Sequence, residues 1–274
     1  MAKIRRPWEA CSPRTTSITA RKPRRSAWWA VPVWLALWQL ASMSLAAGLP
    51  HGELLLPSPV RVLARLGQLA LTASFWTAAG RSAGHILGGF FLAAAAAVLL
   101  AALAARFPAA EELLRPAVAA VKTVPVMSFI ILALLWLPAE NLSVFIAGLM
   151  VFPPVYLNLL EGFSRLDPEL EEMARLFAVP FRRRLRELYV PQLLPYFRSS
   201  CALALGLCWK AGVAAEVIGL PRGTLGERLY SAKVYWETPD LFAWTIAVVG
   251  LSVLFERLLL ALLDAAAGEG RRVR

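Results

Sequence analysis

Residues 82–105 read SAGHILGGFFLAAAAAVLLAALAA, a stretch without Asp, Glu, Lys or Arg. An α-helix rises about 1.5 Å per residue, so about 20 apolar residues cross a bilayer core of about 30 Å. The stretch is long enough to cross and carries no charge that would resist burial in lipid. It predicts a membrane-spanning helix, around which the rest of the chain is interpreted.

Other apolar runs of similar length flank this stretch on both sides. They cover residues 26–50, 116–139, 141–160, 193–215 and 241–263, with Lys122, Arg198, Lys210, Glu256 and Arg257 as their charged residues. Together with the first stretch they give six predicted spans. The predicted fold class is therefore all-α, a polytopic membrane protein with about six transmembrane helices.

The composition excludes the common soluble classes. Of the 274 residues, 58% are hydrophobic and 17% are charged, against about 25% charged in an ordinary soluble domain. The net charge of +11 is compatible with nucleic-acid binding. However, the basic residues flank apolar runs instead of forming one stripe. The pattern favours a lipid bilayer over nucleic acid as the partner.

The basic residues also predict an orientation in the cell membrane. With the N-terminus in the cytoplasm, 19 of the 29 Lys and Arg residues fall in cytoplasmic segments and six in outer loops. Both termini are then cytoplasmic: residues 1–26 form a basic, disordered arm, 27–264 the membrane domain and 265–274 a tail. The first span also resembles a signal peptide with a cleavage site at residues 44–46, but its full membrane length favours a retained helix.

Two smaller features lie around the second predicted span. Residues 56–79 carry apolar residues at roughly helical spacing and are expected on the outer membrane surface. Gly84 and Gly88 form a GxxxG motif, which serves helix packing within one chain as often as dimerisation.

Motifs for catalysis are missing from the sequence. It contains no GxxxxGK[ST] phosphate loop, no HExxH and no GxSxG. The three cysteines form no CxxC pair and the two histidines are isolated, so neither a metal site nor a cofactor is predicted. The chain is not expected to be an enzyme, and any ATP hydrolysis that drives it belongs to another subunit.

The loop at residues 161–192, between the fourth and fifth predicted spans, is the longest predicted cytoplasmic loop. Asp167-Pro168-Glu169 is typical of a helix start, with Asp as N-cap and Pro in the first turn. Apolar residues follow at i, i+3, i+4 and i+7, namely Leu170, Met173, Ala174 and Phe177. A second helix carries Arg182, Arg183, Arg184 and Arg186, and Pro191 and Pro195 are expected to end it.

This loop has two interpretations. It can lie on the inner leaflet, with the arginines on lipid phosphates. The second helix suits that, but carboxylates beside the first helix would be repelled by an anionic surface. An apolar helix face bordered by carboxylates suits a groove on another protein, and we favour that interpretation.

The spacing in this loop resembles the EAA-x3-G-x9-I-x-L-P motif of the binding-protein-dependent ABC importer permeases. The matching residues are Glu172-Met173-Ala174, Ala178 at the glycine position, and Leu188-Tyr189-Val190-Pro191. Residues 209–219 and several later positions resemble the nitrate/sulfonate/taurine branch. Alanine in place of glycine is not expected to adopt a positive φ readily.

The resemblance implies a type I importer permease that brings a small solute, such as nitrate, a sulfonate or taurine, into the cytoplasm. Its implied partners are two ABC ATPase subunits, a second permease copy and an extracytoplasmic solute-binding protein. The helix at 169–178 would then enter a groove on the ATPase. Glu172, Met173 and Phe177 would contact it, while Ala174 and Ala178 would permit close approach. The coupling segment as a whole covers residues 169–191, ending at Pro191.

Ionisable residues in or beside the spans are candidates for the translocation pathway, because charge in lipid is costly. They are Lys122, Lys210 and Glu216. Lys210 and Glu216 could pair with each other or line the path, and Lys122 is as well explained by helix packing as by a pathway role. The lysines are compatible with an anionic solute.

Two other functions remain open from sequence. A stand-alone secondary transporter or channel subunit would require ion-coupling residues at mid-membrane and inverted repeats. A membrane scaffold would use the loop to recruit a soluble partner. An importer differs from both in binding an ATPase subunit.

Overall fold

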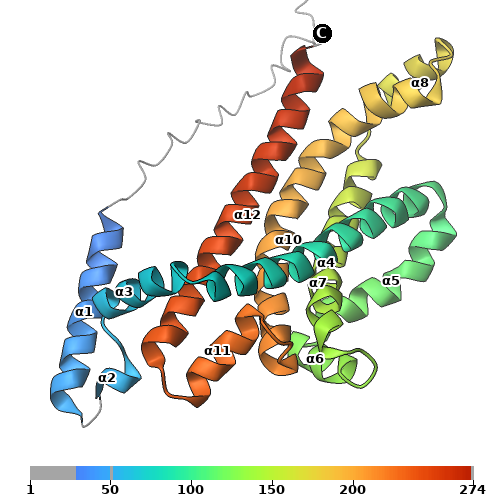
Figure 1. The fold of residues 1–274 in the computed structure, drawn as a ribbon. Helices are drawn as coiled ribbons and strands as arrows, with labels where there is room; N and C mark the ends of the chain where they lie inside the picture. The colour runs from blue at the N-terminus through green and yellow to red at the C-terminus, as the bar shows by residue number, and fades with distance from the viewer. Residues whose placement is uncertain (1–28, 50–51, 273–274) are drawn as a thin grey trace, which may run out of the picture.

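The computed structural model describes residues 29–49 and 52–272, which form helices joined by short turns, without a strand in these two ranges (Figure 1). The predicted arm at 1–26 lies outside them. The first helices are α1 (Ala30–Gly48), α2 (Gly52–Leu55), α3 (Pro59–Ala70), α4 (Ala73–Arg106), α5 (Pro108–Thr123), α6 (Val126–Ala133) and α7 (Ala139–Ser164). After them come α8 (Pro168–Leu176), α9 (Phe181–Arg184), a π-helix (Leu185–Tyr189), α10 (Val190–Gly219), α11 (Leu225–Val234) and α12 (Thr238–Arg272).

Five helices of the described chain are long and apolar enough to cross a bilayer. They are α1, α4, α7, the continuous helix Phe181–Gly219 and α12. These match five of the six predicted spans, which confirms the all-α, multi-pass membrane fold. Helix α12 continues to Arg272, through most of the residues predicted to form a tail.

The predicted span at 116–139 is wrong as a single straight helix. Helices α5 and α6 occupy this region and are bent by 103° relative to each other. The break falls at Val124-Pro125, where Val124 has the extended backbone (φ −74°, ψ 133°) that a following proline favours. The two helices together count as at most one broken span, so the described residues contain five spans or six.

Small residues allow the central helices to approach closely. A Cβ on Gly89 of α4 would collide with the carbonyl oxygen of Val144 in α7, so only glycine fits there. Four buried alanines continue this contact face along α4, namely Ala94, Ala97, Ala101 and Ala104. A Cβ on Gly84 or Gly88 meets nothing within 4 Å, so the GxxxG motif does not pack these helices within the chain.

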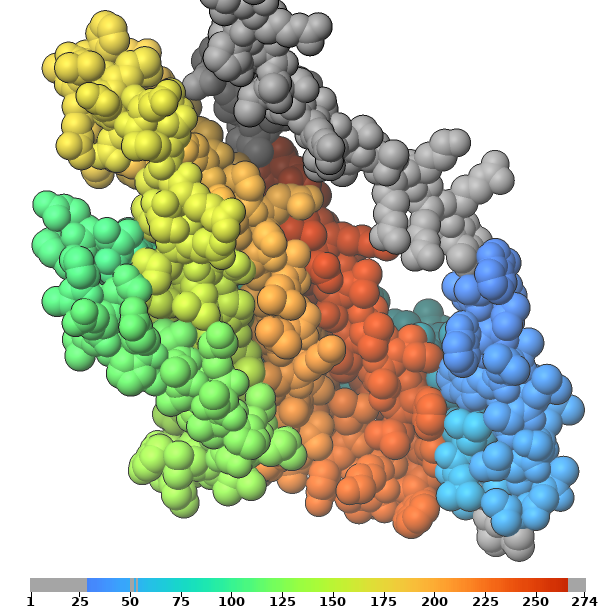
Figure 2. Space-filling view, turned by 180° about the vertical axis from the view of Figure 1, so that it is seen from behind, coloured from blue at the N-terminus to red at the C-terminus, as the bar shows by residue number. Residues whose placement is uncertain are grey.

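Helices α10 and α12 run in a similar direction in Figure 1, whereas α3 and α4 cross them. Helix α8 and the last turns of α12 lie at one end of the molecule, while α2, α6 and α11 lie at the other. Figure 2 shows α7 and α10 side by side between α5 and α12, with α8 projecting beyond them. The orientation predicted from the basic residues stays a prediction.

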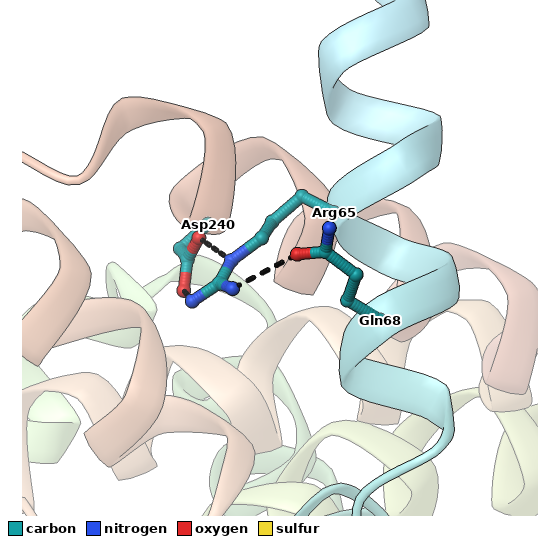
Figure 3. Close-up of polar contacts among 3 residues, drawn as sticks. All are labelled: Arg65, Gln68 and Asp240. Atoms are coloured by element: carbon teal, nitrogen blue, oxygen red, sulfur yellow. Dashed lines mark hydrogen bonds and ion pairs between the residues drawn. The ribbon is translucent and has the colours of Figure 1, made fainter.

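An ion pair holds α3 against the start of α12 (Figure 3). Both donors of the Arg65 fork reach Asp240: Nε lies 2.5 Å from Oδ1 and Nη2 lies 2.9 Å from Oδ2. Gln68 accepts from the third guanidinium nitrogen at 3.1 Å. The hydrogen bond to Asp240 raises the pKa of Arg65, so the guanidinium stays charged, and its two bonds to Asp240 orient α3.

Candidate coupling site

Helix α8 begins as its first residues predict. The Asp167 carboxylate accepts from the backbone N–H groups of Glu169 and Leu170, at 2.9 and 3.4 Å, and Pro168 occupies the first turn. The N–H of Asp167 donates to the side chain of Gln192 at 3.0 Å, which ties this helix start to α10. The cap therefore fixes α8 at a defined position relative to a membrane helix.

Helix α8 ends at Leu176, two residues before the predicted end at Ala178. The N–H of Val179 donates to the carbonyl of Ala174 and that of Ala178 to Arg175, the bond pattern of a Schellman motif. Ala178 has φ +48°, so alanine does adopt the left-handed conformation that we expected only of glycine. A left-handed alanine costs about 1 kcal/mol relative to glycine, and the two C-terminal hydrogen bonds offset this cost.

The outward face of α8 is apolar with an acidic border. We call Glu172, Met173, Leu176 and Phe177 the α8 surface. Leu176 and Phe177 are each 78% exposed and Met173 is 48% exposed. Sequence reasoning missed Leu176, although it lies at i+3 from Met173 and i+4 from Glu172. A patch of this kind on an exposed helix is typical of a protein-binding surface.

Ala174 does not lie on this surface. Ala174 is only 5% exposed. This burial does not support the expectation that Ala174 permits close approach of a partner, because the chain itself already covers the small side chain. Ala178 is exposed beyond the helix end.

The charges of α8 divide between its faces. Arg175 donates to Glu171 one turn away at 2.6 Å, and this hydrogen bond raises the pKa of Arg175. Among the described residues, Glu172 has no hydrogen-bonding or ion-pairing side chain as a partner. Its exposed carboxylate is thus available to a donor on another molecule.

The arginine-rich segment is not a separate helix. Residues 181–219 run as one helix, in which a π-helical turn at Leu185–Tyr189 joins α9 to α10. Pro191 lies just after the π-helical turn, which accommodates its missing N–H, and Pro195 lies inside the helix. The prediction that these prolines end the helix is wrong. One unbroken helix thus leads from the residues that follow α8 into the membrane region.

The three pathway candidates do not form one cluster. Glu216 is fully buried, whereas Lys210 is exposed, and the predicted alternative that they pair is not what the structure shows. The Ser82 hydroxyl donates to Glu216 Oε2 at 2.6 Å, and the Gly226 N–H donates to the same oxygen at 3.2 Å. Lys122 lies elsewhere, beside the break between α5 and α6.

Glu216 joins three helices at the end opposite α8. Its partners are Ser82 on α4 and the first turn of α11, and the Ser82 hydroxyl also accepts from the N–H of Leu225 at 2.8 Å. A Cβ on Gly226 would collide with Glu216, so glycine is needed at this close approach. Sequence reasoning missed Ser82, which is 134 positions away from Glu216.

Comparison with known proteins identifies the class. The family described as "Binding-protein-dependent transport system inner membrane component" matches residues 97–267, more than half of the chain. The chain belongs to this family and is a permease of the ABC importer class. The matched region includes α8, the π-helical turn and Glu216.

Individual relatives agree with this assignment. A protein of Escherichia coli named as an aliphatic sulfonates transport permease is 30% identical over 89% of this chain and 88% of its own length. A Bacillus subtilis protein with the same type of name is 28% identical over 82% of this chain and 81% of its own length. The riboflavin transport system permease protein RibX of Chloroflexus aurantiacus is 31% identical over 82% of this chain and 85% of its own length.

Proposed function

We propose that this chain imports a small solute by converting the motion of separate ATPase subunits into movement of its membrane helices. The observation that carries the proposal is the α8 surface, an exposed apolar and acidic patch at one end of the bundle. It is joined by the Gln192 hydrogen bond, and by the continuous helix 181–219, to the membrane region. In this scheme Glu172, Met173, Leu176 and Phe177 enter a groove on the ATPase.

The proposed assembly contains two ATPase subunits, two copies of this chain and an extracytoplasmic solute-binding protein in the cell membrane. The missing phosphate loop supports a separate ATPase, because a permease without one needs another source of energy. The open face at Gly84 and Gly88 supports a second copy, since small residues without a partner in the chain suit contact between helices of two copies. The α8 end, with both termini, faces the cytoplasm.

The transport cycle follows from the connection between α8 and α10. Closure of the ATPase pair on ATP would bring the two α8 helices together. Rigid rotation of the connected membrane helices would then exchange an inward-open for an outward-open pathway. Residues 169–191 form the coupling segment in this proposal. They carry no catalytic group of their own, and ATP is hydrolysed in the partner.

The proposed solute is a small anion such as a sulfonate, nitrate or taurine. Relatives named for aliphatic sulfonates support this choice, and so does the nitrate import permease protein NrtB of Synechococcus elongatus, which is 24% identical over 74% of this chain.

Uptake into proteoliposomes tests the function. The vesicles would contain the full chain with its ATPase subunit, and would receive the binding protein loaded in turn with labelled ethanesulfonate, taurine or nitrate. We expect one of these solutes to accumulate only when ATP is on the ATPase side. Accumulation without ATP or without the ATPase subunit would show a secondary transporter or channel. A chain that binds no ATPase subunit would contradict the proposal.

A further inference from the structure

A hollow of about 410 Å³ opens beside the break between α5 and α6. Helices α5, α6, α7 and α10 contribute its walls, and Figure 2 shows these helices on one face of the bundle. A volume of this size suits a small organic molecule. We call it the Lys122 hollow, because Lys122 is the only charged residue among those that line it.

The lining of this hollow is apolar apart from two side chains. Lys122 comes from the last turn of α5 and Asn158 from α7, while the other walls include Leu149, Pro153 and Leu203. Among the described residues, neither Lys122 nor Asn158 has a side-chain hydrogen bond or ion pair. An apolar pocket with a few unpartnered polar groups is typical of a site that binds and orients a solute.

The position of the hollow supports the same conclusion. It lies where the apolar segment 108–133 is interrupted, and α7 and α10 face it with residues from the middle of their spans. Broken helices at mid-membrane are a recurring element of solute sites in transporters. Val126, in the first turn of α6, also lines the hollow, so the positive end of a short helix adds to the lysine charge.

We propose that the Lys122 hollow binds the transported solute within the membrane and that it selects an organic anion with a short apolar body. Lys122 pairs with the anionic group, Asn158 offers its amide to the same end, and the leucine and proline walls contact the apolar body. A divalent cation is disfavoured, since no carboxylate lines the hollow. This inference rests on the proposed transport function and assigns its solute-binding residues.

Thiol labelling measures the charge preference of the hollow without any transport. Leu203 lines the hollow, is 58% exposed and leaves Lys122 and Asn158 unchanged when it is replaced. The reporter is Leu203→Cys in the full chain with Cys11→Ser; Cys201 and Cys208 are 0% exposed and stay in place. Membrane vesicles are treated with the anionic reagent 2-sulfonatoethyl methanethiosulfonate and with its trimethylammonium counterpart, and the chain without Leu203→Cys is the blank.

We expect the ratio of anionic to cationic labelling rates to fall about tenfold when Lys122→Gln is added, because the nearby positive charge is removed. Lys122→Arg keeps the charge and should retain the ratio. Lys233→Gln, an exposed lysine on α11, is the matched control and should leave the ratio unchanged. An unchanged ratio in Lys122→Gln, or no labelling by either reagent because a second copy seals the hollow, would overturn the proposal.

The uptake experiment separates this inference from the proposed function. ATP-driven uptake with an unchanged labelling ratio would leave the permease function intact and place the solute elsewhere. A tenfold fall in the ratio without ATP-driven uptake would show an anion-selective hollow in a protein that is not an importer.

Discussion

Replacing Glu216 with alanine is expected to destabilise the chain by about 3 kcal/mol, because the buried Ser82 hydroxyl and the Gly226 N–H lose their shared acceptor. The side chain also leaves a cavity where α4, α10 and α11 meet. For a domain of this size the loss corresponds to a fall in Tm of about 6–12 °C. Cys201 and Cys208 are fully buried, so in a chain with Cys11→Ser a thiol-reactive dye reports unfolding in detergent without an added label.

Two further variants test whether the lost hydrogen bonds cause the fall in Tm. Glu216→Gln keeps an acceptor oxygen of similar shape, so it should lose less stability than Glu216→Ala. Glu237→Ala removes an exposed carboxylate at the same end of the bundle and should leave Tm within about 2 °C. Equal Tm values for Glu216→Ala and Glu237→Ala would show that the buried network does not hold α11 in place.

The second large effect is expected at the α8 surface. Leu176→Asp combined with Phe177→Asp places two negative charges in the apolar part of this surface, where both residues are 78% exposed. Each is expected to remove about 2 kcal/mol of docking free energy, or together about 1,000-fold in the docking equilibrium. Solute-stimulated ATP hydrolysis by the reconstituted complex should fall to its basal rate, while the amount of permease in the membrane stays the same.

The choice of these positions follows from burial. A bulky residue at Ala174 would press on the chain's own packing and confuse loss of docking with misfolding. Leu176 and Phe177 extend away from the fold, so their replacement spares it. Leu176→Met with Phe177→Leu keeps the surface apolar and should retain most of the stimulation. Full stimulation in the aspartate variant would show that α8 is not the coupling element.

The sequence was sufficient for the spans that are straight and for the start of α8. Uncharged runs predict bilayer crossing from length alone, and the Asp167-Pro168 cap is a local signal that needs no tertiary contact. The prediction of one straight span at 116–139 failed because hydropathy does not show where the backbone changes direction. Pro125 and the extended Val124 carried the missing information about the bend.

Contacts between distant residues were not predictable from local patterns. Ala174 and Phe177 belong to one apolar stripe. The spacing of this stripe does not show that Ala174 is buried by the chain itself and that Phe177 is exposed. Glu216 and Ser82 lie on different helices, and no spacing in the sequence links them. The position of Glu216 at the edge of a predicted span marked it as a candidate functional residue. Its hydrogen-bond partners could be identified only from the three-dimensional structure.

The continuity of residues 181–219 supports the mechanical role that we propose for the α8 region. A flexible linker between the arginine segment and the membrane would absorb movement of α8. The π-helical turn instead accommodates Pro191 without interrupting the helix. Together with the hydrogen bond from Asp167 to Gln192, this makes α8 and the membrane helix one connected unit.

Site-specific photo-crosslinking tests the central claim, that α8 contacts a separate ATPase, most directly. A photoreactive amino acid would replace Phe177, and in a second chain Trp236, which is 69% exposed at the opposite end of the bundle. In membranes containing the assembled transporter, we predict an ATPase adduct from position 177 and none from position 236. Adducts from position 177 with lipid alone, or an ATPase adduct from position 236, would contradict the account.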